Sequence, residues 1–479
     1  MNRSMVRYLL SKLLLIEATL LFVPLIVALI YQEPLQNLLS IIMTIIILLL
    51  IGGIGVLIKP KDHHIYTREG MLIVALCWIL WSFFGALPFV FSGQIPSLID
   101  AFFETSSGFT TTGATILADV SVLSRSMLFW RSFAHLIGGM GVLVFALAIM
   151  ENSRGSLLEV MRAEVPGPVF GKVVSKLKET AQILYILYLV MFAIFTVLLI
   201  LAGMPIFDSF ITAMGTAGTG GFAVYNDSMS HYNSSLLTNL VSVGMLVFGI
   251  NFNLYYFLLL RKVKMFFSDE ELRAYLAIVF GATALIALNV LGMYDHFFDG
   301  LEKVFFEVST IVTTTGFGLT DVIHWPMFSQ CILLLLMFIG GSAGSTAGGF
   351  KVMRVLMLSK ISRNHILSTL YPNRILSLHI NDTVIDKETQ RNVLRYLATY
   401  IIGFVILLLF LALDSNDFMV VFSAATSSFN NIGPLLGTTD TFAIFSPFSK
   451  VLLSFTMIAG RLEIYPIILL MLPKTWSKV

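Results

Sequence analysis

The chain has 479 residues, of which 57% are hydrophobic and only 12% are charged. This composition excludes a soluble globular protein and indicates an integral membrane protein. The formal net charge is only +2, but the charges are distributed very unevenly along the chain.

Ten apolar runs are each long enough to cross a hydrocarbon core of ~30 Å as a helix. The runs lie near residues 8–31, 38–58, 71–92, 127–150, 181–204, 234–260, 272–294, 327–357, 393–413 and 447–472. The first run is too long for a signal-peptide core and lacks a small-residue cleavage site, so we expect a retained helix. The sequence therefore predicts an all-α integral membrane protein with ten transmembrane helices and both termini on the same side.

Charged residues divide unequally between the two sets of loops that connect these runs. One set holds fourteen acidic residues and a single basic residue, Lys303. Its segments lie near residues 32–37, 92–124, 204–235, 295–326 and 414–446. The other set carries almost all lysines and arginines, and the positive-inside rule predicts that this set and both termini are cytoplasmic. The acidic set would form an outer vestibule that attracts cations, unless it merely complements the positive-inside bias.

Four short turns, each centred on a glycine, recur between the apolar runs. Their glycines are 95 to 117 residues apart. The turns contain Thr111, Thr112, Gly113 and Ala114; Thr219, Gly220, Gly221 and Phe222; Thr314, Thr315, Gly316 and Phe317; and Asn431, Ile432, Gly433 and Pro434. Regular recurrence at this spacing indicates an internal repeat rather than chance.

The residues that precede the turns also agree when the four glycines are aligned. A phenylalanine lies eleven positions upstream each time, and a small residue lies six positions upstream: Phe102, Phe210, Phe305 and Phe422; Ser107, Gly215, Thr310 and Ser427. Glu104 and Glu307 are in register nine positions upstream. Stretches of about ten residues that open near Asp100, Asp208, Asp299 and Asp417 are too short to span a bilayer and suit half-helices with an acidic N-cap. Their carboxyl ends would favour a cation at the membrane centre.

These features predict two N-terminal helices in residues 1–60, followed by four units of helix, pore loop and helix around a pseudo-fourfold pore. The units would cover residues 61–165, 166–262, 263–375 and 376–479. Backbone carbonyls can replace the water around a cation where glycine permits left-handed conformations. The candidate ion-binding residues are Thr111, Thr112, Gly113, Thr219, Gly220, Gly221, Thr314, Thr315, Gly316, Asn431, Ile432 and Gly433. The alternative is that the turns merely reverse a hairpin.

With these loops and the extra helix pair before them, the whole chain resembles the TrkH family of bacterial Trk potassium uptake systems. The resemblance implies that Gly113, Gly221, Gly316 and Gly433 form a K⁺ selectivity filter, in which Asn431 and Pro434 depart most from a channel sequence. It also implies an inner-membrane homodimer and a cytosolic TrkA-like subunit that binds NAD and ATP or ADP. The chain itself has no glycine motif for a nucleotide, so we expect no nucleotide site in it.

A glycine-rich stretch interrupts the eighth apolar run. Its residues are Gly340, Gly341, Ser342, Ala343, Gly344, Ser345, Thr346, Ala347, Gly348 and Gly349. Five glycines would cost a regular helix ~1 kcal/mol each, so we expect the helix to break there. The family resemblance implies that the break is the gate below the filter. Two alternatives are a GxxxGxxxG helix-packing face and a GxSxG nucleophile that uses Ser342 or Ser345.

Three charged or titratable residues lie inside later apolar runs. Arg461 is costly within a membrane span, and the resemblance implies that it projects below the filter as an electrostatic barrier to ions. It would otherwise pair with Glu463 or another carboxylate, or reach the interface. Arg131 and His135 are one helical turn apart, which favours packing or an interface over a proton relay.

The function that these patterns predict is selective K⁺ uptake, with K⁺ bound only in transit, by a chain that is not an enzyme. A Na⁺-permeable transporter or an H⁺-coupled symporter on the same scaffold is the first alternative. An intramembrane serine hydrolase is the remote one.

Overall fold

The computed structural model describes residues 2–62, 64–141, 177–374, 376–381, 383–436 and 440–476. Within these ranges the secondary structure is helical apart from one antiparallel hairpin, β1 (His379–Ile380) and β2 (Thr383–Val384), which pairs His379 with Val384. The second half of the expected span at 127–150, the expected boundary near 165 and most of the basic segment at 154–178 lie outside the described residues.

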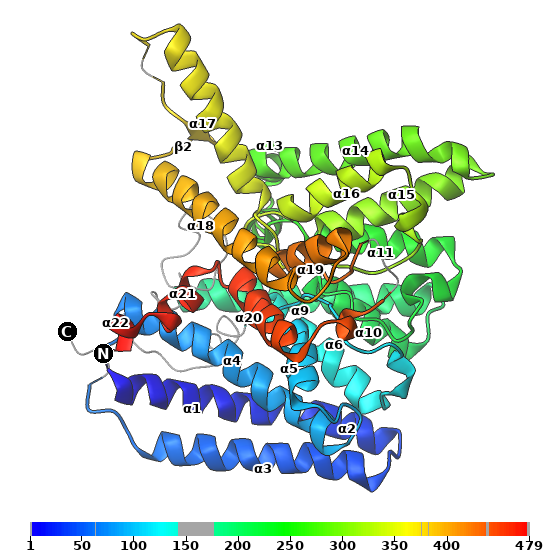
Figure 1. Cartoon of the computed structure of the whole chain (residues 1–479), viewed down its shortest axis with the longest axis vertical. Helices are drawn as coiled ribbons and strands as arrows, with labels where there is room; N and C mark the ends of the chain where they lie inside the picture. The colour runs from blue at the N-terminus through cyan, green and yellow to red at the C-terminus, as the bar shows by residue number, and fades with distance from the viewer. Residues whose placement is uncertain are drawn as a thin grey trace.

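The N-terminal helices lie along one edge of the molecule (Figure 1). They are α1 (Arg3–Leu20), α2 (Phe22–Ile30), α3 (Leu35–Leu57) and α4 (Thr67–Phe91). The first apolar run is divided into α1 and α2 because the ring of Pro24 clashes with the carbonyl of residue 20, four positions earlier. The antiparallel helices α1 and α3 pack closely, and both also contact α4.

Six helical segments in the described residues are long and apolar enough to cross a membrane. They are Arg3–Ile30, Leu35–Leu57, Thr67–Phe91, Ala181–Leu201 within α9 (Leu177–Leu201), Glu270–Met293 and Lys387–Leu411. The fifth comprises α14 (Glu270–Val290) and the 3₁₀ turn η3 (Leu291–Met293), and the sixth is α18 (Lys387–Leu411). A seventh crossing is reached if α11 (Ser235–Phe248) and α12 (Phe252–Leu259), which meet at 91°, are counted as one span. The expected total of ten transmembrane helices therefore stays a prediction.

The helices that follow the glycine turns are shorter than expected. They are α6 (Arg125–Gly139), α11, α16 (Met327–Ile339) and α20 (Pro447–Arg461), with 13 to 15 residues each. At 1.5 Å per residue each is roughly 20–22 Å long, less than the ~30 Å core. The expectation of continuous helices over 234–260 and 447–472 is therefore wrong, whereas the break expected at 340–349 within the run at 327–357 is confirmed.

Each of these three breaks has a local cause. After α11, the side chain of Asn251 caps α12 by accepting from the backbone N–H of Asn253, and the chain turns at this cap. After α16 comes the glycine-rich stretch, and α17 (Val352–Leu370) begins beyond it. After α20, Pro466 cannot continue a helix, and Glu463 and Ile464 adopt positive φ before α21 (Tyr465–Met471). Two further short helices in the described residues are α13 (Val263–Ser268) and α22 (Pro473–Trp476).

Four half-helices lead into the four glycine turns. They are α5 (Leu98–Phe109), α10 (Ile206–Gly218), α15 (Phe297–Val312) and α19 (Phe418–Asn430). Each packs against the short helix after the preceding turn: α10 against α6, α15 against α11, and α19 against α16. The half-helix α5 packs against α20, the short helix after the last turn. This packing order joins the start of the chain to its end and closes a ring.

The expected acidic N-caps occur at only one half-helix. Asp417 accepts from the first backbone N–H groups of α19, whereas the N-caps of α5, α10 and α15 are Ser97, Pro205 and His296. Asp100, Asp208 and Asp299 lie in the first turn of their helices instead. A carboxylate there still complements the helix dipole, without receiving the capping hydrogen bonds.

The two termini lie together at one side of the molecule, while α17 and the hairpin project away from the other helices (Figure 1). The Nη2 atom of Arg3 donates to the backbone carbonyl of Trp476 at 2.8 Å. A chain with both termini on one side of the membrane crosses it an even number of times. The contact between Arg3 and Trp476 agrees with this expectation.

Candidate functional site

The four glycine turns share one backbone conformation. The glycine and the residue two positions before it have positive φ in every turn, between +54° and +109°. The pairs are Thr111 and Gly113, Thr219 and Gly221, Thr314 and Gly316, and Asn431 and Gly433. The residue between them does not have positive φ in any turn. Alternation of residues with and without positive φ can turn successive carbonyls toward the same side of the chain, which is the arrangement that a row of cation-binding carbonyls requires.

Each turn is also fastened to its own half-helix in the same way. The backbone N–H just before the glycine donates, at 2.8 to 3.0 Å, to the carbonyl six positions before the glycine. The accepting residues are Ser107, Gly215, Thr310 and Ser427. These are the small residues that the alignment brings into register, and they allow the chain to fold back closely over the end of the helix.

The four turns lie against one another in cyclic order. In each turn, a Cβ atom added at the glycine would approach the carbonyl oxygen of the residue that precedes the glycine of the next turn. The Cβ would overlap with this oxygen in three turns and lie 2.6 Å from it at Gly433. The pairs are Gly113 with Gly220, Gly221 with Thr315, Gly316 with Ile432, and Gly433 with Thr112. The order runs from the first to the fourth turn and back to the first, so the four turns form a closed ring. Only glycine fits at these close approaches.

Side chains connect the ring where the last turn meets the first. The Nδ2 atom of Asn431 donates to Thr112 Oγ1 and to the carbonyl of Met457, both at 2.9 Å. Thr112 Oγ1 also pairs with Thr110 Oγ1 at 2.7 Å. An asparagine at the position that threonine occupies in the other turns thus bridges two turns and a short helix, which a threonine side chain is too short to do.

Buried carboxylates hold the chain segments that leave two of the turns. Glu104 accepts from Thr115 Oγ1 and from the backbone N–H of Ile116, and Glu307 accepts from the backbone N–H groups of Leu319 and Thr320. Both acids are at most 5% exposed. The two glutamates occupy equivalent positions in the sequence, and each holds the segment that directly follows its turn.

Arg131 and His135 pack against the first and second turns. The Nε atom of Arg131 pairs with Glu104 at 2.5 Å, and its guanidinium lies 3.5 Å from the ring centroid of Phe222. His135 Nδ1 is 2.7 Å from the carbonyl of Gly108, and its ring stacks on Phe222. These contacts favour the packing interpretation of both residues over the proton relay.

The glycine-rich stretch crosses directly beside the ring. The backbone N–H of Gly348 donates to Thr314 Oγ1 at 2.6 Å, and that of Gly349 donates to the carbonyl of Asn430 at 2.9 Å. Its other end enters the bend after α11, where Ser342 N–H donates to Gly249 and Gly344 accepts from Phe252. The stretch thus contacts the third turn, the end of α19 and the bend between α11 and α12.

Two alternatives for this stretch are wrong. Residues 340–349 are not helical, so they present no GxxxGxxxG face. A nucleophile elbow follows a strand, but the helix α16 precedes Gly340 here. In the described residues Ser342 Oγ has no hydrogen-bond partner, and Ser345 Oγ donates to the carbonyl of Ser342, so neither hydroxyl is oriented by a histidine or a carboxylate.

Glu271 is a residue of this site that sequence reasoning missed. It lies in the first turn of α14 and is 1% exposed. Its Oε1 accepts from the backbone N–H of Ala343 at 2.6 Å and of Met353 at 3.1 Å. One carboxylate therefore ties the first half of the glycine-rich stretch to the start of α17, just beyond its last residue. The feature of the sequence that could have identified Glu271 is a cluster of acids, Asp269 to Glu271, in the set of loops that is otherwise rich in lysine and arginine.

Arg461 lies at the end of α20 and connects the glycine-rich stretch to α6. Its Nη1 donates to the carbonyl of Thr346 at 2.7 Å, and its Nη2 donates to those of Gly138 and Gly139 at 2.7 and 2.5 Å. Arg461 is 6% exposed. The structure records an ion pair of Glu463 with Arg354 at 2.5 Å.

The acidic side of the molecule is less negative than the loop count predicts. Arg125 lies 3.9 Å from Asp208, and Lys450 lies 2.7 Å from Asp100. Both basic residues lie in the first turns of short helices, just beyond the counted loops, which is why the count omits them. In the loop between the first turn and α6, the hydroxyl and backbone N–H of Ser121 donate to Asp119 and hold the pKa of that carboxyl below its ordinary value. Asp119 therefore stays charged at neutral pH.

Comparisons with known proteins agree with this arrangement. The family model described as TrkH, cation transport protein, matches residues 38–478. The Trk system potassium uptake protein TrkH of Salmonella typhimurium is 32% identical over 466 residues, which cover 96% of each chain. TrkG of Escherichia coli is 34% identical over 454 residues and 93% of each chain. The crystal structure of the potassium transporter TrkH from Vibrio parahaemolyticus superposes with a TM-score of 0.89, 30% identity and full coverage of both chains.

These matches extend over both the helix pair at the start and the ring of turns. They place the chain among multi-pass membrane transport proteins and not among enzymes. The chain belongs to the TrkH family of cation transport proteins.

Proposed function

We propose that this chain is the K⁺-translocating subunit of a Trk-type uptake system in a bacterial inner membrane. Relatives along almost the whole length are named Trk system potassium uptake proteins. The observation that carries the proposal is the closed ring of four turns, each with positive φ at the glycine and at the residue two positions before it. Rings of backbone carbonyls replace the hydration shell of a K⁺ ion in other channels.

In this proposal, ions enter on the acidic side and lose water at the filter. The filter consists of Thr111, Thr112, Gly113, Thr219, Gly220, Gly221, Thr314, Thr315, Gly316, Asn431, Ile432 and Gly433. The half-helices direct the negative ends of their dipoles at the ring and stabilise the partly dehydrated cation. The buried pair of Glu104 and Arg131 keeps the first turn in position without contact with the ion.

We assign the gate to residues 340–349 and an electrostatic barrier to Arg461. The stretch contacts the third turn through Gly348 and Thr314, which supports a position on the ion path next to the filter. Arg461 donates to the carbonyl of Thr346 within the stretch. A buried guanidinium beside the path opposes a cation, and its hydrogen bonds hold the stretch in place.

The assembly that we propose is a homodimer with one pore in each protomer and cytoplasmic termini. A cytosolic TrkA-like subunit that binds nucleotides would open the gate. The positive-inside distribution of lysine and arginine supports the orientation, and the contact between Arg3 and Trp476 supports termini on one side.

Growth rescue tests the proposal. A bacterium that lacks its own K⁺ uptake systems should grow at micromolar to millimolar K⁺ when it expresses this chain with a TrkA-like partner. Gly113→Ser and Gly316→Ser should admit more Na⁺ and rescue growth less well at low K⁺. Failure of the wild-type chain to rescue growth, despite normal membrane insertion and an active partner, would contradict the proposal.

Flux measurements separate K⁺ uptake from its alternatives on the same scaffold. We expect K⁺ or Rb⁺ uptake into proteoliposomes to exceed Na⁺ uptake under equal gradients. A transmembrane pH gradient should not drive uphill K⁺ accumulation in the absence of a membrane potential. Accumulation driven by pH alone would favour the H⁺-coupled symporter instead.

A further inference from the structure

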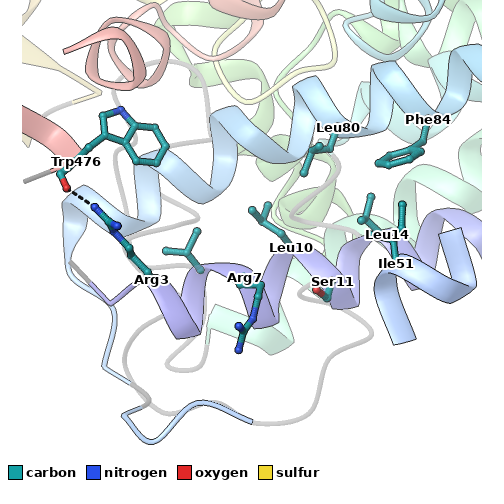
Figure 2. A pocket seen from close by; sticks show the side chains of 10 residues that line it. Arg3, Arg7, Leu10, Ser11, Leu14, Ile51, Leu80, Phe84 and Trp476 are labelled. Carbon is teal, nitrogen blue, oxygen red and sulfur yellow. Dashed lines mark hydrogen bonds between the residues drawn. The ribbon is translucent and has the colours of Figure 1, made fainter. Parts of the chain in front are cut away.

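A groove with a charged end and an apolar interior lies between the N-terminal helices and the C-terminus. Its volume is about 510 Å³, within the roughly 300–1,000 Å³ typical of ligand sites. Helices α1, α3, α4 and α22 contribute its walls (Figure 2). None of its lining residues belongs to the ring of turns or to the glycine-rich stretch, so the groove is separate from the proposed ion path.

The charged end of the groove carries two arginines and a tryptophan. Arg3 donates to the carbonyl of Trp476, and Arg7 donates through Nη2 to the carbonyl of Ile58 at 3.2 Å. Each bond uses one of the five N–H donors of a guanidinium, so both arginines keep donors for a further acceptor. Arginine forks suit phosphate oxygens, and tryptophan is enriched at membrane interfaces.

The interior of the groove is lined by hydrocarbon side chains. Figure 2 shows Leu10, Leu14, Leu80 and Phe84 beyond Arg3, on facing sides of α1 and α4. Leu14 follows Arg3 by eleven residues, about 16 Å along a helix. That distance is about half of the ~30 Å hydrocarbon core, the depth of one leaflet.

We propose that this groove binds one anionic phospholipid. Its phosphate would accept from Arg3 beside Trp476, Arg7 would add positive charge at the same end of the groove, and one acyl chain would lie along Leu10, Leu14 and Phe84. The complementarity of two guanidinium groups with a negative headgroup, at the end of an apolar groove one leaflet deep, selects this occupant over a zwitterionic lipid or a peptide.

Native mass spectrometry of the detergent-purified full chain tests the site. Titration with phosphatidylglycerol should give one retained lipid at concentrations where phosphatidylcholine of the same chain length is not retained. Each basic side chain near a negative lipid contributes about fivefold to affinity, so the double variant Arg3→Gln, Arg7→Gln should bind phosphatidylglycerol about 25-fold more weakly. Equal retention of the two lipids by the wild-type chain would overturn the proposal.

Matched variants separate the groove from general surface charge and from misfolding. Lys59→Gln with Lys61→Gln removes the same charge from exposed residues outside the groove, and this pair should retain the lipid. Leu10→Trp fills the apolar interior without a change in charge and should also weaken retention, whereas Ile54→Trp on the exposed face of α3 should not. If the lysine pair loses as much lipid as the arginine pair, or if Leu10→Trp retains the lipid fully, the groove is not the site. The readout is lipid occupancy, so the outcome does not depend on the proposed transport function.

Discussion

At the glycine of each turn, two constraints act on a single residue. Gly221 has φ of +72°, and an added Cβ would overlap with the carbonyl oxygen of Thr315 in the neighbouring turn. An L side chain in this conformation costs about 1–2 kcal/mol, and the overlap would push a carbonyl of the third turn out of line. The functional requirement for glycine here is therefore backbone geometry at a contact between two turns.

We predict that Gly221→Ala abolishes K⁺ selectivity and reduces Rb⁺ uptake at least tenfold at equal expression. The matched control is Gly281→Ala, because Gly281 lies on an exposed face of α14 with no atom within 4 Å of an added Cβ. That change should leave uptake intact and stabilise the helix by up to about 1 kcal/mol. A Gly221→Ala protein with a wild-type ratio of K⁺ to Na⁺ uptake would place the filter elsewhere.

Arg461 combines a charge with three hydrogen bonds, and two substitutions distinguish these contributions. Arg461→Ala should raise Rb⁺ flux into proteoliposomes several-fold, because both the positive charge and the link between Thr346 and α6 are lost. Arg461→Lys keeps the charge but not the planar fork that bridges several carbonyls. Low flux in the lysine variant would identify electrostatic repulsion as the barrier, and high flux would identify the hydrogen bonds. Unchanged flux in the alanine variant at normal expression would rule out both.

The glycine-rich stretch is the element whose motion the proposed gating requires. Regular hydrogen bonds do not stabilise it, since it is neither helix nor strand. Its position depends instead on single contacts from other elements: Glu271 of α14, Arg461 of α20, Thr314 of the third turn, Asn430 of α19, and Gly249 and Phe252 at the bend between α11 and α12. A segment held in this way can move when one or two contacts are lost.

We predict that Glu271→Ala increases Rb⁺ flux about tenfold in the absence of a partner. It removes the acceptor of two buried backbone N–H groups, and an unsatisfied buried donor costs about 1–3 kcal/mol. Glu271→Gln keeps an acceptor oxygen and should give an intermediate flux. Glu270→Ala is the control, because Glu270 pairs with Lys360 and accepts from Asn381, outside the stretch. Equal flux in the Glu270 and Glu271 variants would show that the carboxylate does not hold the gate.

For the whole molecule, the decisive contacts join the first and last parts of the chain. Lys450 in α20 pairs with Asp100 in the first turn of α5 at 2.7 Å, across 350 residues of sequence. Asn431 reaches Thr112 across 319 residues. The ring therefore closes only when the fourth turn is in place.

We predict that Lys450→Met lowers the free energy of unfolding by about 1–3 kcal/mol. The pair is only partly exposed, at 10% and 27% of its two side chains. Lys303→Met, which breaks an exposed pair with Asp299 within one helix, should cost at most about 1 kcal/mol. Thermal unfolding in detergent measures both variants. If Lys450→Met is no more destabilising than Lys303→Met, closure of the ring does not depend on this pair.

Several parts of the site could be predicted because their signals are local. Alignment on four glycines places the positions of positive φ, the small residues whose carbonyls accept from the turns, and the pair of Glu104 and Glu307. The break at residues 340–349 follows from glycine content. The partners of Arg131, Glu271 and Lys450 could not be predicted, because each pairs with a residue on another element whose position a single sequence does not encode.

Some sequence expectations failed for a different reason. Hydropathy cannot distinguish a continuous span from two helices that meet at an angle, since both are apolar, so the runs at 234–260 and 447–472 look unbroken. Arg125 and Lys450 escaped the charge count because they lie within the first turns of helices rather than in loops.

The sequence by itself determined that this is a multi-pass helical membrane protein with four related glycine turns, because hydrophobic length and glycine conformation are properties of short segments. Only the tertiary structure decided that the turns meet in cyclic order, that Glu271 and Arg461 hold the glycine-rich stretch, and that two arginines end an apolar groove. Those facts depend on contacts between residues up to several hundred positions apart. The packing of helices creates such contacts, and no local pattern specifies them.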